Sequence, residues 1–233
     1  MRRGTLMRKP MLGKGLLSLL IVLGALPAAA AGLQWGAQGG VNLARVAYGI
    51  PGILDPGDVE DRFLTGARGG VVLSLASAGC SPITVETGLS LERRGGETAL
   101  PVRTEFSTES TLMVAATYRM TCLTVPVAAK ARLGSGAVRP YAKAGGEVVF
   151  PLSAELEDRL SPGNRVIDIK DDVKTLNFGL LGALGVEFPL ASVTGTAEVS
   201  YHHGIGDFRD VSGADADAQL RHRVVGFALG VLF

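Results

Sequence analysis

The chain has 233 residues, enough for one domain of ordinary size, with 47% hydrophobic residues, 19% charged residues and a mean hydropathy of +0.30. Its formal net charge is +1 and falls to −4 without residues 1–30, because that segment holds five basic and no acidic residues. A mildly acidic chain argues against a nucleic-acid partner. The high hydropathy and the 32 glycines favour a strand-rich protein with tight turns over an ordinary soluble one.

The first 30 residues have the pattern of a secretory signal peptide. A basic stretch precedes an apolar run at 16–31 that ends in Leu-Pro-Ala-Ala-Ala-Ala. We expect cleavage near Ala30 or Ala31, which leaves residues 31–233 as a single domain. An uncleaved anchor is the alternative, although the apolar run is shorter than the ~20 residues that a helical span needs.

From Leu33 onward, apolar residues recur at every second position, which is the period of a β-strand. Eight strands are predicted, at about 33–43, 63–75, 83–93, 111–133, 138–150, 176–188, 193–205 and 220–233. Each has at least about the 9–11 residues that a tilted strand needs to cross a bilayer. Polar loops are predicted at 47–62, 95–110, 151–172 and around 207–217, and short turns join the other strands.

The connections therefore alternate between long and short, and an even number of strands leaves both termini at the short-turn end. In a bilayer the sheet has to close, because an open edge would leave backbone groups without hydrogen bonds. We predict an all-β fold: a closed, eight-stranded, antiparallel, up-and-down transmembrane β-barrel. Pro126 is awkward in the middle of a strand because it removes a ladder donor, and we expect a bulge or weak pairing there.

The bulky side of each strand is expected to face lipid. In the strand at 176–188, Leu180 and Leu184 alternate with small residues. The last strand, LRHRVVGFALGVLF, carries Phe227 on its bulky face and ends on Phe233, which is how the closing strand of a bacterial outer-membrane barrel ends. We therefore expect outer-membrane lipids as partners, and the barrel-assembly machinery as a partner of this strand.

Charged residues gather at the inward positions. The predicted lumen charge network consists of Arg68, Glu86, Lys130, Lys143, Glu147, Glu187 and Glu198, and the same pattern also places Glu92, Arg132, Arg139 and Arg221 inside. The interior of an eight-stranded barrel is just wide enough for side chains to fill it, and buried charges have to be paired. We expect a salt-bridged plug. A conductive polar path and acid–base catalysis by Glu147, Glu187 or Glu198 are the alternatives.

Nothing in the sequence matches a cofactor, metal or nucleophile motif, so we expect no enzymatic chemistry. Adjacent residues His202 and His203 point to opposite faces of a strand, which opposes a shared metal ion, and the aspartates at 207–217 do not match an EF-hand loop. Cys80 and Cys122 are the only cysteines. We place Cys80 at the inner rim and Cys122 nearer mid-strand, too far apart for a disulfide, although export would permit one.

The stretch from Leu123 to Phe233 resembles the PorT-type branch of bacterial outer-membrane β-barrel domain proteins, often called porin-family proteins. The resemblance lies in LTVPVAAKARLG, RPYAKAGGEVVFPLSAE, FGLLGALGVEFPL, AEVSYHHGIGDF and GFALGVLF, and GAQGGVNLA is similar to that family's first strand. It implies the fold and an integral outer-membrane location, and it implies no particular activity.

A structural or surface-interaction role follows as the expected function. The alternatives are a narrow pore for small solutes, an outer-membrane enzyme, and a soluble barrel that binds a small hydrophobic ligand. That last alternative would need an apolar interior and a polar exterior, which is the reverse of the strands at 176–188 and 220–233.

Overall fold

The structure is a computed structural model that describes residues 32–49, 60–76, 82–103, 111–158, 165–206, 208 and 219–233. The predicted signal peptide, Cys80 and the aspartates at 207–217 lie outside these residues. Within the described part, no helix is long and apolar enough to cross a membrane.

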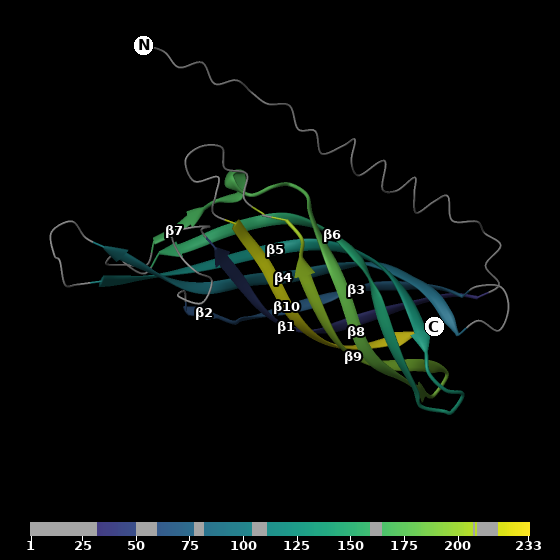
Figure 1. The fold of residues 1–233 in the computed structure, drawn as a ribbon. Coiled ribbons are helices and arrows are strands. Elements are labelled where there is room, and N and C mark those ends of the chain that lie inside the picture. The colour runs from purple at the N-terminus through teal and green to yellow at the C-terminus, as the bar shows by residue number, and fades with distance from the viewer. Residues whose placement is uncertain are drawn as a thin grey trace, which may run out of the picture.

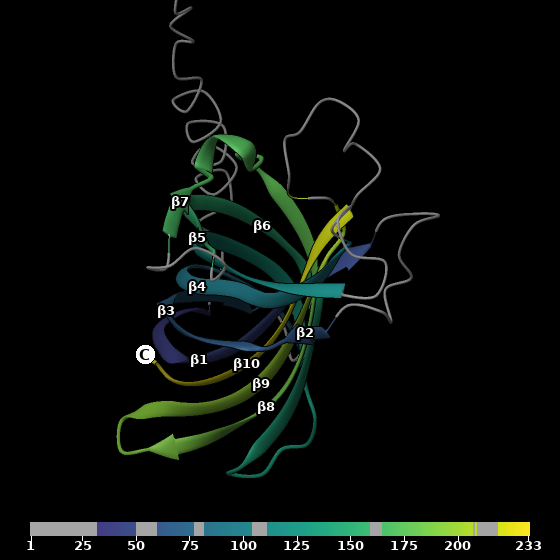
Figure 2. The ribbon, with the colours of Figure 1, turned by 90° about the vertical axis from the view of Figure 1, so that its left-hand side faces the viewer.

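Eight long antiparallel strands form a ring (Figures 1 and 2). In ring order they are β1 (Leu33–Gly49), β3 (Leu64–Ala76), β4 (Ile83–Arg103), β5 (Thr111–Arg132), β6 (Arg139–Asp158), β8 (Asn177–Leu190), β9 (Val193–Gly204) and β10 (Gln219–Leu232). The β1–β10 ladder, from Gly36–Leu232 to Gly49–Gln219, closes the ring. The prediction of an all-β, closed, eight-stranded antiparallel barrel is therefore confirmed.

The strands at the long-connection end are longer than predicted. β4 continues to Arg103 and pairs with β5 from Thr111, so the loop predicted at 95–110 was wrong for residues 95–103. Most of the loop predicted at 151–172 is also structured, because β6 continues to Asp158 and β7 (Arg165–Asp168) pairs with it. The short strand β2 (Glu60–Arg62) pairs with β4, and the 3₁₀ helix η1 (Lys170–Asp172) follows β7. The prediction ended these strands too early because hydrophobic alternation reveals only strand segments that have an apolar side. The ladders continue into polar sequence.

The two ends of the barrel differ, as Figure 1 shows. The C-terminus lies at the end where β8 and β9 are joined by only Ala191 and Ser192, while β2, β7 and the end of the β4–β5 ladder lie at the other end. Ala191 adopts a left-handed backbone conformation with φ of 53° in this tight turn. In outer-membrane barrels the short turns face the periplasm and the long connections face outward.

Side chains alternate across the wall as predicted. On the outer face Leu184 is 69% exposed and Leu229 is 68% exposed, whereas their inward neighbours Ala183 and Ala228 are buried. Other large apolar residues on the outside are Leu33, Trp35, Val41, Val71, Ile83, Val85, Leu89, Leu91, Val127, Leu133, Phe178, Leu180, Val199, Tyr201, Phe227 and Phe233. An apolar exterior around a charged interior opposes the soluble ligand-binding alternative.

Pro126 weakens one ladder without shifting it. The β4–β5 pairing skips Pro126 and Val125 but keeps the same register on both sides. The hydroxyl of Thr87 donates to the Pro126 carbonyl at 2.8 Å, which satisfies this acceptor. The expected weak pairing is therefore present, while the bulge lies elsewhere, where the β5–β6 register shifts between Thr121 and Cys122.

An apolar cluster spans the interior at the long-connection end. This apolar cap consists of Val46, Met120, Cys122, Val149, Ala154, Val173 and Phe208. Because β1 lies across the ring from β5 and β6, a cluster of residues from these strands joins opposite walls. Phe208 also stacks on His222 with ring centroids 4.2 Å apart, and its carbonyl accepts a hydrogen bond from the Lys174 backbone N–H.

Replacing Leu184 tests the lipid-facing surface. Leu184 lies near the middle of β8, so Leu184→Arg would place a charge near the centre of the bilayer and should destabilise the barrel by about 2–4 kcal/mol. Val138→Arg is the control, because Val138 is similarly exposed but lies at the short-turn end of β6, where the cost should be about 0–1 kcal/mol. Urea unfolding in lipid vesicles would measure both. Equal stabilities would contradict the orientation of the wall.

Candidate functional site

The structure places all seven residues of the predicted lumen charge network inside the barrel. Six are buried, with between 1% and 9% of their surface exposed, and Glu198 is half-buried. They come from β3, β4, β5, β6, β8 and β9, so charged side chains approach one another from most of the ring. Their contacts form two groups that lie one above the other along the barrel.

The lysine–glutamate cluster lies toward the short-turn end and contains Glu86, Lys130, Lys143, Glu187 and Glu198. Lys130 Nζ lies 2.6 Å from Glu187 Oε1 and 3.3 Å from Glu86 Oε2. Lys143 Nζ contacts Glu86 and lies 2.5 Å from Glu198 Oε2. Each lysine therefore bridges two glutamates, and Glu86 joins the two lysines into one continuous chain.

Further side chains complete this cluster at its edges. The Tyr141 hydroxyl donates to Glu198 at 3.0 Å, and the nitrogens of Lys130 and Lys143 lie 4.2 Å and 5.2 Å from the centre of its ring. Arg132 Nε donates to Glu187 at 2.8 Å. Cation–π contact and charge-assisted hydrogen bonds replace part of the hydration that the buried charges have lost.

The arginine cluster lies in the middle of the barrel and is centred on Arg94. The Arg94 guanidinium donates two hydrogen bonds to Glu147, at 2.9 Å and 3.1 Å, and a third to Glu92 at 2.9 Å. Arg68 Nη2 lies 3.8 Å from the other oxygen of Glu92. A planar guanidinium that binds a carboxylate through two parallel bonds is a geometrically specific contact, so Arg94 holds β4 and β6 in a fixed relation.

Ser200, His202 and Glu147 form a hydrogen-bonded chain within the same cluster. Ser200 Oγ lies 3.0 Å from His202 Nε2, and His202 Nδ1 lies 2.7 Å from Glu147 Oε2. This is the order of groups in a serine hydrolase triad. Arg68, however, donates to Ser200 Oγ at 3.0 Å, and the adjoining cavity measures about 20 Å³, room for about one water molecule. A substrate has no access to this serine in the closed barrel.

The charges of the interior balance. Among the described residues, the inward basic side chains are Arg68, Arg94, Lys130, Arg132 and Lys143, and the inward acidic ones are Glu86, Glu92, Glu147, Glu187 and Glu198. Five positive groups thus face five negative ones in paired contact. Such an interior has no excess charge to draw ions of one sign through it.

Inward glycines make room for these long side chains. A Cβ atom at Gly226 would lie 2.5 Å from Arg68 Nη1 and 2.6 Å from Ser200 Oγ, and one at Gly185 would overlap the ring of Tyr141. Gly226 belongs to β10 and Gly185 to β8, whereas the side chains that lie over them come from β3, β9 and β6. The interior is thus filled by long side chains that lie against glycine positions of other strands.

Sequence reasoning missed Arg94 and misplaced Arg221. The third strand was predicted to end at Arg93, so the next inward position was not considered, although the alternation through Ser90 and Glu92 reaches it. Arg221 is exposed on the outer face, because it lies an even number of residues before the outward-facing Phe227 on the same strand. Arg139, also predicted inside, lies 3.6 Å from Glu187, but 41% of its side chain is exposed at the rim.

The structure also locates the remaining candidates for chemistry. His202 is buried inside and His203 lies on the outer face, as predicted for neighbours on a strand. No group of three or more His, Cys, Asp or Glu side chains in the described part of the chain could hold a metal ion. Cys122 is buried in the apolar cap. Since Cys80 lies outside the described residues, the absence of a disulfide stays a prediction.

Both aromatic residues of the C-terminal signature lie on the outer face of β10 or just beyond it. Phe227 is 44% exposed and Phe233 is 52% exposed. The Phe233 backbone N–H donates to the Trp35 carbonyl at 2.8 Å, and the two rings stack with centroids 4.5 Å apart. The last residue therefore extends the closing ladder by one bond, and the pair places two aromatic rings at the short-turn border.

Comparison with known proteins identifies a family and several distant structures. A family model described as outer membrane protein beta-barrel domain matches residues 27–210. Similar solved structures include the outer membrane protein OprG from Pseudomonas aeruginosa, with 12% identity and a TM-score of 0.45 over 86% of this chain and 95% of that one. Neisserial surface protein A (11%, 0.42) and Ail of Yersinia pestis (11%, 0.33) each match over 86% of this chain and 98% of their own. No curated protein matches the sequence.

Removing Arg94 tests how strongly the interior depends on its pairs. Arg94→Met leaves Glu92 and Glu147 buried without their main cation and should destabilise the barrel by about 3–5 kcal/mol in urea unfolding. Adding Glu147→Leu removes one of the stranded charges, so the double variant should recover part of that loss. The control is Arg119→Met, whose ion pair with Glu157 is 55% exposed on the arginine side and should contribute about 0–1 kcal/mol. Similar losses for Arg94 and Arg119 would rule out a tightly coupled interior.

Proposed function

The chain belongs to the outer membrane protein beta-barrel domain family, and on that premise we propose that it is a sealed integral barrel with a structural or surface-interaction role. The observation that carries this proposal is the succession of paired charges and apolar side chains along the interior. The lysine–glutamate cluster, the arginine cluster and the apolar cap follow one another from the short-turn end to the long-connection end. We also propose that the chain belongs to the PorT-type branch that its sequence resembles.

Opening a path through this interior requires contacts to be broken in series. An ion would have to separate Lys130 and Lys143 from their glutamates and then displace Arg94 from Glu147. Leaving one partner of a buried pair uncompensated costs about 3–5 kcal/mol. The apolar cap adds a layer of packed apolar side chains beyond the charges. A narrow pore is therefore the less favoured role.

A surface role is supported by the strands that extend past the apolar exterior. The β4–β5 ladder continues to Arg103 and Thr111, well beyond the exposed residue Leu91 of β4. β7 extends the sheet beside β6 at the same end. Paired backbone gives these extensions a defined shape outside the bilayer, where they can meet other molecules.

Assembly of the barrel is the second part of the proposal. β10 presents Phe227 outward and Phe233 follows it with a side chain that is half exposed, so both rings are accessible to a partner before the β1–β10 ladder closes. We propose that the barrel-assembly machinery binds this strand and that outer-membrane lipids surround the finished wall. Replacing Phe227 and Phe233 with alanine should lower the amount of barrel assembled in the membrane more than it lowers the unfolding free energy of the purified barrel.

Planar-bilayer recording tests the sealed interior. Purified wild-type protein should show little or no steady current, because the interior contacts leave no continuous water path. Glu147→Ala and Glu187→Ala each remove an acceptor shared by basic groups and should raise leakage or lower thermal stability. Large, long-lived, ion-selective openings of the wild-type protein would overturn the proposal and favour the pore.

Hydrolysis is a second candidate because of one specific observation, the Ser200–His202–Glu147 chain. The geometry lacks room for a substrate, and Arg68 already donates to the serine oxygen. We therefore expect a fluorophosphonate probe to leave the folded protein unlabelled. Labelling that is lost in Ser200→Ala but kept in a control, Ser153→Ala on the outer face, would make hydrolysis the leading candidate.

A further inference from the structure

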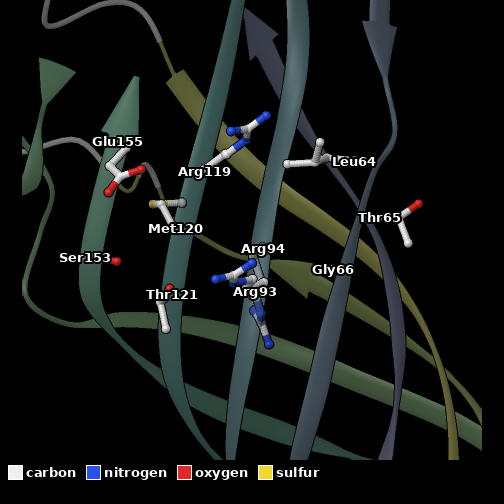
Figure 3. A pocket seen from close by; sticks show the side chains of 10 residues that line it. All are labelled: Leu64, Thr65, Gly66, Arg93, Arg94, Arg119, Met120, Thr121, Ser153 and Glu155. Carbon is white, nitrogen blue, oxygen red and sulfur yellow. The ribbon is translucent and has the colours of Figure 1, made fainter. Parts of the chain in front are cut away.

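A polar cavity of about 510 Å³ lies in the wall at the long-connection end (Figure 3). It spans β3, β4, β5 and β6. Its lining includes Thr65, Arg93, Arg119, Thr121, Ser153 and Glu155. Two exposed guanidinium groups, three hydroxyls and a carboxylate thus gather around this space, and the buried side chains of Arg94 and Met120 also line it.

These six side chains belong to the outer face of the barrel. Arg93 follows Leu91 at the next outward position of β4, and Leu91 is 51% exposed among the apolar residues of the exterior. Arg93 pairs across the sheet with Thr121, which pairs with Ser153. The rung below contains Leu91 and Leu123, so on β4 and β5 the outward residues change from apolar to polar at this rung. The cavity therefore lies at the border between acyl chains and headgroups.

The backbone of β3 contributes to the floor of the cavity at Gly66. A Cβ atom there would overlap the Arg93 carbonyl, so this position has no room for a side chain. The β3–β4 ladder also begins only at Arg68–Glu92, so residues 64–67 of β3 are not paired with β4 beside the cavity. This gap in the ladder contributes to the hollow.

The lining fits a phosphate ester that carries hydroxyl groups. Arginine binds phosphate oxygens through charge-assisted, often bidentate hydrogen bonds. Arg93 is exposed, and no carboxylate of the described residues lies within salt-bridge distance of it. Arg119 is held from one side by Glu157 at 3.0 Å, which orients its guanidinium. Glu155 and the hydroxyls can accept hydrogen bonds from a polyol, whose hydroxyl groups lie at some distance from the phosphate that the arginines bind.

We propose that this cavity binds the phosphorylated, hydroxyl-bearing headgroup of an outer-leaflet lipid. The inference rests on the proposed membrane placement, in which the long connections face outward. Acyl chains of such a lipid lie along the exposed surface of Leu91 and its neighbours while the phosphate reaches Arg93 and Arg119. The wall thus selects one kind of lipid at one position, in addition to its general contact with the bilayer.

Native mass spectrometry of the full chain released from detergent micelles tests this site. Phosphatidylglycerol supplies a phosphate and two free hydroxyls, whereas phosphatidylcholine supplies the phosphate with a cationic group in their place. The wild-type barrel should retain one phosphatidylglycerol about tenfold more strongly than phosphatidylcholine, and Arg93→Gln/Arg119→Gln should abolish this preference. Equal retention of the two lipids by the wild-type barrel would overturn the proposal.

Arg223→Gln is the matched control, because Arg223 lies on the outer face of β10 and does not line the cavity. It removes the same charge and should leave the preference unchanged. An equal loss in this control would mean that basic residues attract anionic lipid generally, which would overturn the site. Complete displacement of the lipid by millimolar inorganic phosphate would also overturn the headgroup assignment in favour of a free anion.

Failure of this inference and failure of the proposed function give different results. Heat-modifiable migration on a gel and bilayer recording of the same preparation report whether the barrel is folded, inserted and sealed. A sealed barrel without lipid preference would refute the cavity assignment alone. A protein that does not insert would refute the membrane placement on which both proposals depend.

Discussion

Closure of the sheet through the β1–β10 ladder is the constraint on which the rest of the structure depends. In a bilayer the backbone groups of two open edges would have no hydrogen-bond partners, and pairing from Gly36–Leu232 to Gly49–Gln219 removes both edges. Closing eight strands sets the width of the ring, and a ring of this width holds side chains and little else. The filling of the interior with side chains is thus a consequence of strand number combined with inward residues of sufficient length.

The filling of that interior is ordered along the barrel. Two lysines and three glutamates occupy the short-turn end, an arginine with two carboxylates occupies the middle, and apolar residues occupy the far end. Because the interior charges are paired with one another, the surface-interaction role that we propose falls to the outer face and to the strands beyond it. The border cavity at Arg93 is placed where those two surfaces meet.

Much of this could be predicted from the sequence, because alternation in strands such as β8 and β10 determines which residues face in. It placed Lys130 and Glu187 inside, but it could not show that Lys130 joins Glu187 to Glu86, since contacts across the ring depend on register. Arg94 was missed because the alternating apolar residues by which a strand is recognised stop near Leu91, whereas the β4–β5 ladder continues beyond it. The Ser200–His202 pair had a visible signal, two polar residues at i and i+2, but its carboxylate lies 55 residues away.

The glycines beneath the long interior side chains have a consequence for how this barrel can change over time. Because Arg68 and Ser200 occupy the space above Gly226, and Tyr141 that above Gly185, a methyl group gained at either glycine has to be matched by a shorter residue on another strand. Positions far apart in the chain are therefore coupled, and neither glycine can be replaced by a larger residue without a second substitution on another strand. Outward residues such as Leu184 and Leu229, whose side chains are two-thirds exposed, can instead vary one residue at a time.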